Sequence, residues 1–307
     1  MSRTAYLGTS EFAARVLRVL AESKHRPALV VTPPDRPKGR GRRTAPPPAA
    51  DAARELGIDV LQTADVSSDG AIARLRHVAP DVVAVCAFGQ LIREPLLSEV
   101  EGLNVHPSLL PRWRGAAPIE RAIMAGDRVT GVCVMRVTAG LDSGPVALCE
   151  EVEVEPGEDF GALSGRLAGI GGELLVRALD LRDRGELALT DQDEQGATYA
   201  EKIDPADRRL SPREPADELE RRVRALNPHV GTFLETGDGQ RLGVKRAEPV
   251  PESDLAPGQL AARDGRLLLG TGHGALSLEV VQSPGGRPLP AADWLRGNDP
   301  PPSVPAA

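Results

Sequence analysis

Short apolar runs alternate with amphipathic stretches through the first half of the chain. Buried strands are predicted where runs rich in apolar residues end at turn residues, at 4–7, 28–31, 81–85 and 103–106. Helices are predicted between them, where apolar residues recur at helical spacing, at about 11–20, 48–57 and 69–78. This alternation predicts an α/β fold with a Rossmann-like, mostly parallel sheet covered by helices on both faces. Such sheets bind ligands at the carboxyl ends of their strands.

The pattern changes after a long helix that apolar spacing predicts from about residue 160 to 181. A polar stretch at 190–196 reads as a linker, and an amphipathic helix containing Leu219 and Leu226 follows. Short β-like runs separated by glycine turns then predict a small barrel, with strands at 232–235, 241–247, 258–262, 266–270 and 275–282. We therefore predict an α/β domain at 1–189, a linker at 190–206, a β-domain at 207–297 and a disordered proline-rich tail at 298–307.

Composition narrows the range of functions. The length of 307 residues suits two domains, and a net charge of −7 confines any contact with nucleic acid to a local basic patch. The three cysteines have no CxxC spacing, so we expect buried thiols in a reducing compartment and no metal site. No run approaches the ~18 apolar residues of a membrane span, and a cytoplasmic location is expected.

The first strand-to-helix turn, Gly8-Thr9-Ser10, contains one glycine and no lysine of the P-loop type. The sequence therefore gives little support for a dinucleotide or ATP site here, and a tight strand-to-helix turn is the simpler interpretation.

Two polar residues stand out at the end of a predicted strand. Asn104 and His106 are two positions apart, so their side chains project from the same face of the strand. An asparagine amide can donate to an oxyanion, and a histidine can hold or deliver a proton near neutral pH. Taken alone, His106 is better explained as a structural histidine.

A second loop carries an acidic residue between glycines. Asp142 lies in Gly140-Leu-Asp-Ser-Gly144, after the strand predicted at 131–137. Flanking glycines allow the backbone to approach a ligand closely. The alternative is a turn residue that satisfies its own backbone.

Together these motifs resemble a known superfamily. The stretch Asn104-Val-His-Pro-Ser-Leu-Leu-Pro111 and the later Leu141-Asp-Ser-Gly144 are similar to the 10-formyltetrahydrofolate-dependent formyltransferases. Five further segments resemble the methionyl-tRNA formyltransferase family within it, at 7–13, 34–41, 111–119, 197–202 and 224–228. Ser10 stands where that family usually has proline, and Pro107 where close relatives have glycine.

The resemblance implies direct transfer of a formyl group from 10-formyltetrahydrofolate to the amino group of initiator methionyl-tRNA. It implies that Asn104 stabilises the tetrahedral oxyanion, that His106 assists it or relays a proton, and that Asp142 orients His106 and helps to remove the amine proton. No metal is needed, and a monomer with an OB-like second domain is expected. The folate pocket is expected at Phe88, Gly89, Gln90, Leu91, Ile92, Ser108, Leu109, Leu110 and Pro111, although Phe88 and Leu109 also suit ordinary core packing.

Residues 33–48 form a basic, proline-rich loop in an acidic protein. Five positive charges stand against one negative charge, and six prolines and two glycines argue against regular structure. By composition alone this is a solvated linker. The resemblance implies a loop that contacts the tRNA acceptor stem, with Arg40 as the main contact and Lys38 and Arg42 as helpers. Trp113 and Arg114 are further candidates for the tRNA end, and Trp113 suits the core equally well.

Other readings remain open. A formyltransferase for an amino-sugar nucleotide shares the same three residues and lacks the basic loop. A glycinamide ribonucleotide formyltransferase is a single shorter domain, and a formyl-folate hydrolase has a regulatory domain that this sequence does not show. A non-enzymatic RNA-binding protein is disfavoured because all three polar residues are intact. Phosphate contacts in the second domain are expected from Lys202, Arg208, Arg209, Lys245 and Arg246.

Overall fold

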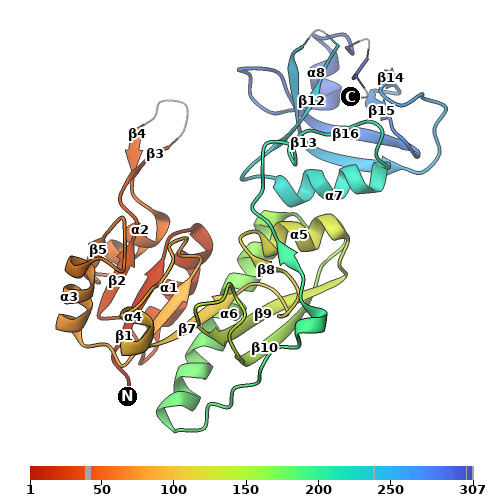
Figure 1. The fold of residues 1–307 in the computed structure, drawn as a ribbon. Coiled ribbons are helices and arrows are strands. Elements are labelled where there is room, and N and C mark those ends of the chain that lie inside the picture. The colour runs from red at the N-terminus through yellow and green to blue at the C-terminus, as the bar shows by residue number, and fades with distance from the viewer. Residues whose placement is uncertain (39–42, 238, 302, 306–307) are drawn as a thin grey trace. The chain divides into compact units, whose positions relative to one another are not determined.

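The computed structural model describes residues 1–38, 43–237, 239–301 and 303–305. Its ribbon is drawn in Figure 1. The chain divides into two compact units. The first contains Met1–Pro118, Val129–Glu153 and Ser164–Ala200, and the second contains Ile119–Arg128, Val154–Leu163 and Glu201–Ala307.

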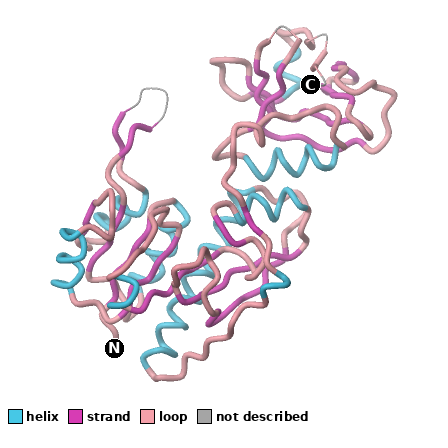
Figure 2. The backbone as a smooth tube through the Cα atoms, viewed as in Figure 1, coloured by secondary structure: helices cyan, strands magenta, loops and turns pink. Residues whose placement is uncertain are grey.

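The first unit is built on a seven-stranded sheet of order β10-β9-β7-β6-β1-β2-β5. Its parallel strands are β1 (Thr4–Gly8), β2 (Leu29–Thr32), β5 (Val60–Gln62), β6 (Val82–Cys86) and β7 (Glu101–His106). Antiparallel pairing adds β9 (Val129–Arg136) and β10 (Val146–Glu153) beyond β7. The predicted mostly parallel sheet is confirmed, and Figure 2 shows its strands interleaved with helices. The strand order reverses between β1 and β6, so a ligand crevice is expected at the carboxyl ends there.

Successive side chains of a strand point to opposite faces of the sheet, so both faces of this apolar sheet have to be covered, and helices cover them. On one face the Tyr6 hydroxyl donates to the Ala13 carbonyl of α1 (Glu11–Glu22) at 2.7 Å. On this face too, α6 (Phe160–Asp183) approaches so closely that a Cβ at Gly171 would lie 2.8 Å from Val105. On the opposite face, Ala5 and Leu7 join one core with residues of α3 (Asp69–Val78) and α4 (Leu96–Glu99).

The proline-rich loop contains regular structure, so the expectation of none is wrong. Strands β3 (Arg36–Lys38) and β4 (Arg43–Ala45) form an antiparallel hairpin, and α2 (Pro48–Glu55) begins directly after it. A two-stranded hairpin leaves one edge of each strand unpaired, which accommodates Pro37, and proline is favoured in the first turn of a helix. Arg40 and Arg42 lie outside the described residues, and of Lys38 only the backbone is described.

The expectation that all three cysteines are free thiols is also wrong. Cys133 on β9 and Cys149 on β10 face each other in the antiparallel register and form a disulfide, with their Cα atoms 4.1 Å apart. The sequence could not show this, because the pairing depends on the register of two strands. Cys86 is a free, buried thiol, and burial raises its pKa to about 12.

The second unit contains an antiparallel sheet of order β12-β13-β16-β15-β14, with β17 (Leu289–Pro290) beside β16. Its other strands are β12 (Thr232–Glu235), β13 (Arg241–Val250), β14 (Leu260–Arg263), β15 (Arg266–Gly270) and β16 (Ala275–Gln282). Helices α7 (Ala216–Leu226) and α8 (Ala291–Leu295) pack on this sheet through Leu219, Val223 and Trp294. Part of the tail expected to be disordered is ordered: Val304 is buried in this core and its N–H donates to Gly258.

The remaining elements are α5 (Pro118–Ala125), the paired strands β8 (Arg114–Gly115) and β11 (Tyr199–Ala200), and a 3₁₀ helix, η1 (Glu194–Gly196). Over the described part of the chain, no helix combines the length and apolar character that crossing a membrane requires.

Candidate active site

Asn104 and His106 lie at the carboxyl end of β7. The register pairs Asn104 with Val85 of β6 and Met135 of β9, and pairs His106 with Cys133 of β9. With strands on both sides, β7 is held rigidly, and its two polar side chains share one face. Asn104 is half-buried, and His106 is 4% exposed. The site is therefore the carboxyl-terminal end of a central strand, where an amide and an imidazole are fixed in a largely apolar setting.

His106 is held through both ring nitrogens. Its Nε2 lies 2.8 Å from the carbonyl oxygen of Trp113, and its Nδ1 lies 3.7 Å from Oδ2 of Asp142. A carbonyl oxygen only accepts, so Nε2 carries a proton. A proton on Nδ1 as well would give an imidazolium that faces the carboxylate at 3.7 Å. Nδ1 is thus the ring atom at which a proton can be exchanged.

Asp142 reaches His106 because its loop adopts an unusual backbone conformation. Its φ of 46° is in the left-handed region, which aspartate tolerates better than most residues. Oδ2 accepts a hydrogen bond from the N–H of Gly115 at 2.9 Å, and this fixes the carboxylate beside the imidazole. Gly144 ends the loop, and a Cβ there would collide with the carbonyl oxygen of Arg136. The structure therefore brings Asp142 to His106 from a separate chain segment.

The sequence did not reveal a glutamine that anchors this loop. The Gln192 amide donates to the carbonyls of Asp142 at 2.9 Å and Gly144 at 2.7 Å. Its Oε1 accepts from Nε of Arg114 at 3.0 Å, and Arg114 also forms two hydrogen bonds to Glu194, at 2.8 and 3.0 Å. Those bonds raise the pKa of Arg114 and lower the pKa of Glu194. The segment expected to be a linker therefore supports the site, and the polarity of 190–196 was its only signal.

Arg114 is not placed to meet a substrate. It is 1% exposed and its guanidinium is engaged by Gln192 and Glu194, so its proposed contact with the tRNA end is not supported. Trp113 is half-buried, has a φ of 61°, and its N–H donates to Thr198 Oγ1 at 2.9 Å. The pairing of β8 with β11 places this backbone next to Asp142, so both residues serve the framework of the site.

The residues expected to bind folate divide into supporting and exposed groups. Ser108 is fully buried and its hydroxyl donates to Arg112, while the Gln90 side chain bonds to the backbone of Val66 and Thr63. Phe88 is 3% exposed and belongs to the core of the sheet. Gly89, Ile92, Leu109, Leu110 and Pro111 lie in the same two loops that follow β6 and β7.

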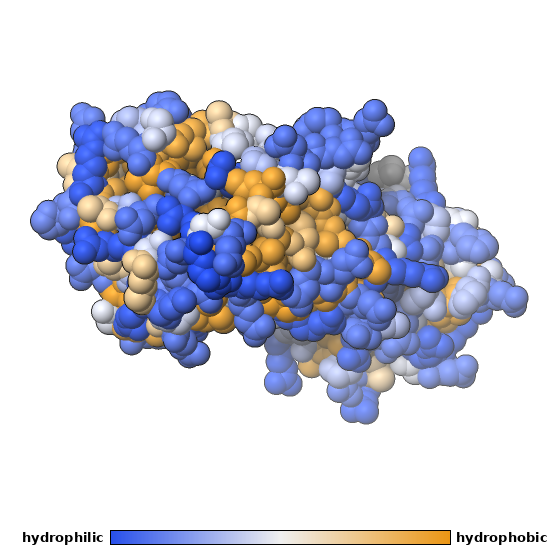
Figure 3. Space-filling model, turned by 90° about the horizontal axis from the view of Figure 1, so that it is seen from below, coloured by the Kyte–Doolittle hydropathy of each residue, from blue (hydrophilic) through white to orange (hydrophobic). Residues whose placement is uncertain are grey.

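Two leucines in the loops around the site remain exposed. Leu91 is 61% exposed and Leu141, directly before Asp142, is 64% exposed. Figure 3 shows that apolar surface, in orange, breaks the polar surface on the face drawn there. Exposed leucines in loops that flank a polar centre suit the faces of a flat ring such as a pterin. Within the described chain, no group of three or more His, Cys, Asp or Glu is arranged to hold a metal ion.

The basic residues of the second unit have mixed surroundings. Lys202 and Arg246 are exposed, whereas Arg209 pairs with Glu235 at 3.2 Å. Arg208 donates to the Gly231 carbonyl, and Arg208 and Arg241 both lie over the ring of Phe233. Burial and the neighbouring Arg208 charge lower the pKa of Lys245. Two adjacent cations of this kind favour an anion between them.

Comparisons with known proteins agree with this geometry. The formyl transferase family matches residues 2–179, and the C-terminal domain of formyl transferases matches residues 202–299. A methionyl-tRNA formyltransferase from Parvibaculum lavamentivorans is 40% identical over 300 residues, which cover 96% of each chain. The enzyme of the same name from Streptomyces coelicolor is 43% identical over 299 residues, again 96% of each chain.

The fold also matches solved structures. HypX from Aquifex aeolicus, in complex with tetrahydrofolic acid, superposes with a TM-score of 0.64 at 20% identity. The match covers 96% of this chain and 47% of that protein, so this chain spans about half of its length. At this identity the likeness shows the fold alone.

Proposed function

The chain belongs to the methionyl-tRNA formyltransferase family, and we propose that Asn104, His106 and Asp142 form its reaction centre. The enzyme transfers the formyl group of 10-formyltetrahydrofolate to the amino group of methionyl-tRNA. The observation that carries our assignment is the approach of Asp142 to His106 at the end of β7, two residues beyond Asn104.

The reaction begins when the neutral amine attacks the formyl carbon, which is bonded to N10 of the folate. A tetrahedral intermediate forms, with negative charge on the former carbonyl oxygen. The Asn104 amide donates to this oxygen, and donors of this kind are worth ~10²–10³ in turnover. Collapse of the intermediate breaks the bond to N10, which receives a proton, and the amine loses one.

The proton transfers are assigned to His106 and Asp142. Because Nε2 is bonded to the Trp113 carbonyl, the imidazole exchanges its proton at Nδ1, on the side that faces Asp142. Beside the imidazole, the Asp142 carboxylate accepts a hydrogen bond from the Gly115 N–H and orients His106. It accepts the amine proton through water, since an ammonium has no lone pair with which to attack.

The test is a pair of Asp→Asn variants. Asp142→Asn keeps the size and the left-handed backbone preference of the residue but removes its charge, and kcat should fall at least ~10²-fold. Asp264→Asn is the matched control, because Asp264 also has a positive φ (50°) and is exposed in the turn between β14 and β15. If folded Asp142→Asn keeps kcat within about threefold of the Asp264 control, the carboxylate has no part in the chemistry.

Contacts to the tRNA are also proposed. Lys38, Arg40 and Arg42 in the basic loop, and the pair of Arg208 and Lys245 in the second unit, are suited to backbone phosphates by their charge. Arg40→Ala should raise the KM for methionyl-tRNA much more than the KM for folate. Preference for the initiator tRNA, a monomeric state and domain limits at 1–189 and 207–297 remain our predictions.

A further inference from the structure

We propose that a proline-lined cavity in the first unit receives the 3′-terminal adenine of methionyl-tRNA, an inference that rests on the proposed function. The cavity has a volume of about 210 Å³. It is lined by Thr9, Pro33, Pro34, Arg36, Pro37, Ala45, Pro46, Pro47 and Pro48. Pockets for drug-sized ligands measure roughly 300–1,000 Å³, so this one suits a single ring system and is too small for a folate.

The cavity lies at the same end of the sheet as the reaction centre, where the parallel strands have their carboxyl ends. Thr9 directly follows β1 and Pro33 directly follows β2, while Asn104 and His106 end β7. The registers pair Gly8 with Cys86 and Cys86 with Val105, which places these strand ends level with one another. Neighbouring strands are ~4.8 Å apart, and β1 and β2 are two and three strands away from β7. The cavity therefore begins about 10 Å from β7 and extends to about 14 Å from it.

These distances decide which part of the substrate can reach the cavity. From the reacting nitrogen, a methionine side chain extends over about five bonds, or roughly 6 Å. The path through the ester and the ribose to the far side of the adenine is roughly 10–14 Å. An amine held at Asn104 therefore places the adenine, and not the methionine side chain, in the cavity.

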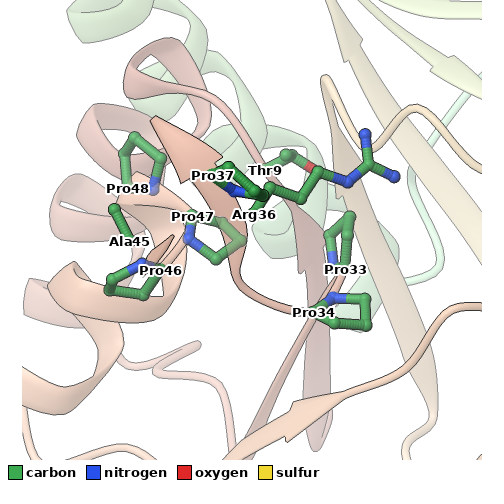
Figure 4. Close-up of a pocket in the computed structure, with 9 residues that line it drawn as sticks. All are labelled: Thr9, Pro33, Pro34, Arg36, Pro37, Ala45, Pro46, Pro47 and Pro48. Carbon is green, nitrogen blue, oxygen red and sulfur yellow. The ribbon is translucent and has the colours of Figure 1, made fainter. Parts of the chain in front are cut away.

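The lining also favours a flat, uncharged ring. In Figure 4, Pro33 and Pro34 form one side and Pro46, Pro47 and Pro48 the other. Pro46, Pro47 and Pro48 have no N–H groups, and the next N–H, from Ala49, donates to the Thr9 carbonyl at 3.4 Å. The start of α2 thus offers poor donors for a phosphate. Proline rings give a rigid apolar surface on which a base can lie. The guanidinium of Arg36 extends past Pro33, away from Pro46, Pro47 and Pro48 (Figure 4).

The walls are held in place without a ligand. The Gln62 amide donates to the Pro33 carbonyl at 3.2 Å and to Oδ1 of Asp35 at 2.7 Å, and its own oxygen accepts from Arg54 at 3.1 Å. On the opposite side, the carbonyl of Pro47 accepts from Ala50 at 2.9 Å. A preformed cavity binds its ligand at a low entropic cost.

The experiment compares two small inhibitors of methionyl-tRNA formylation. One is 3′-deoxy-3′-(methionylamino)adenosine, and the other is methionine amide, which lacks the nucleoside. For the unmodified protein, the adenosine conjugate should have a Ki lower by about tenfold or more, the size of one base-stacking contact. Ala45→Leu fills the cavity and should remove most of this advantage. Thr44→Leu is the control, because Thr44 is exposed and projects from the other face of β4.

The outcomes separate the alternatives. Equal Ki values for the two compounds with the unmodified protein overturn the proposal even if Ala45→Leu fails to fold. An equal rise in both Ki values with Ala45→Leu shows that the cavity holds the methionine side chain, and also overturns it. Failure of the proposed function has a different signature: the unmodified protein then does not formylate methionyl-tRNA at all.

Discussion

Replacing Gln192 with leucine tests whether the loop that carries Asp142 must be anchored. Leucine has a similar size but removes the hydrogen bonds to the carbonyls of Asp142 and Gly144 and the acceptor for Arg114. Neutral hydrogen bonds contribute ~0.5–1.5 kcal/mol each, and those to charged groups ~1.5–3 kcal/mol. Because Gln192 is half-buried, water replaces part of these hydrogen bonds in the variant, and we take the lower end of the sum, about 2.5 kcal/mol.

This free energy restrains the position of the carboxylate. A shift of about 1 Å at a reaction centre can cost ~10²-fold in rate, so kcat of Gln192→Leu should fall ~10–100-fold. The KM for methionyl-tRNA should change less than about threefold, because Gln192 bonds to the loop that carries Leu141 and Asp142 and not to the basic loop.

The assay is initial-rate formylation of methionyl-tRNA, with circular dichroism to confirm folding. Gln195→Leu is the matched control, since Gln195 is an exposed glutamine of the same segment. A folded Gln192→Leu protein with the kcat of the control would refute the anchoring role. So would a rise in KM at constant kcat, which would indicate a substrate contact instead.

Two further predictions concern titrating groups. Burial alone raises the pKa of Asp207, but hydrogen bonds from Arg121 and the Asp204 backbone lower it below its usual value. The ion pair therefore stabilises the folded protein above the unfolded-state pKa of Asp207, and this contribution is lost as the pH falls through the lower folded-state pKa. Arg121→Met should lower the free energy of unfolding by about 1 kcal/mol at pH 7 and by less near pH 3, as measured by urea titration. The pKa of Cys86, raised to about 12 by burial, predicts no alkylation by iodoacetamide at pH 8 until the protein unfolds, and mass spectrometry of the native protein would detect any exception.

Features that depend on local pattern were predictable from the sequence. The central strands are continuous apolar runs, because both of their faces are covered, and the expected runs at 81–85 and 103–106 correspond to β6 and β7. The common face of Asn104 and His106 follows from the two-residue period of a strand. The five β-runs expected in the second domain also correspond closely to β12 to β16.

Features that depend on pairing between distant segments were not predictable. The Cys133–Cys149 disulfide follows from the register of β9 and β10, and β8 pairs with β11 across 85 residues of chain, from Arg114 to Tyr199. Neither strand of that second pair is long enough to show a period. For the same reason the sequence around Gln192 indicates only a polar linker, although this residue bonds to a loop 50 residues earlier in the chain.

The backbone contributes as much to this site as the three side chains do. The Trp113 carbonyl determines which nitrogen of His106 keeps its proton, and the Gly115 N–H fixes the Asp142 carboxylate. Trp113, Gly115 and Asp142 all have positive φ values, of 61°, 117° and 46°. Non-glycine residues in this region cost ~1–3 kcal/mol each and persist only where neighbouring structure holds them. Thr198 and Gln192 supply those restraints, so the segment at 190–200 supports the proposed reaction centre through the backbone of Trp113 and Asp142.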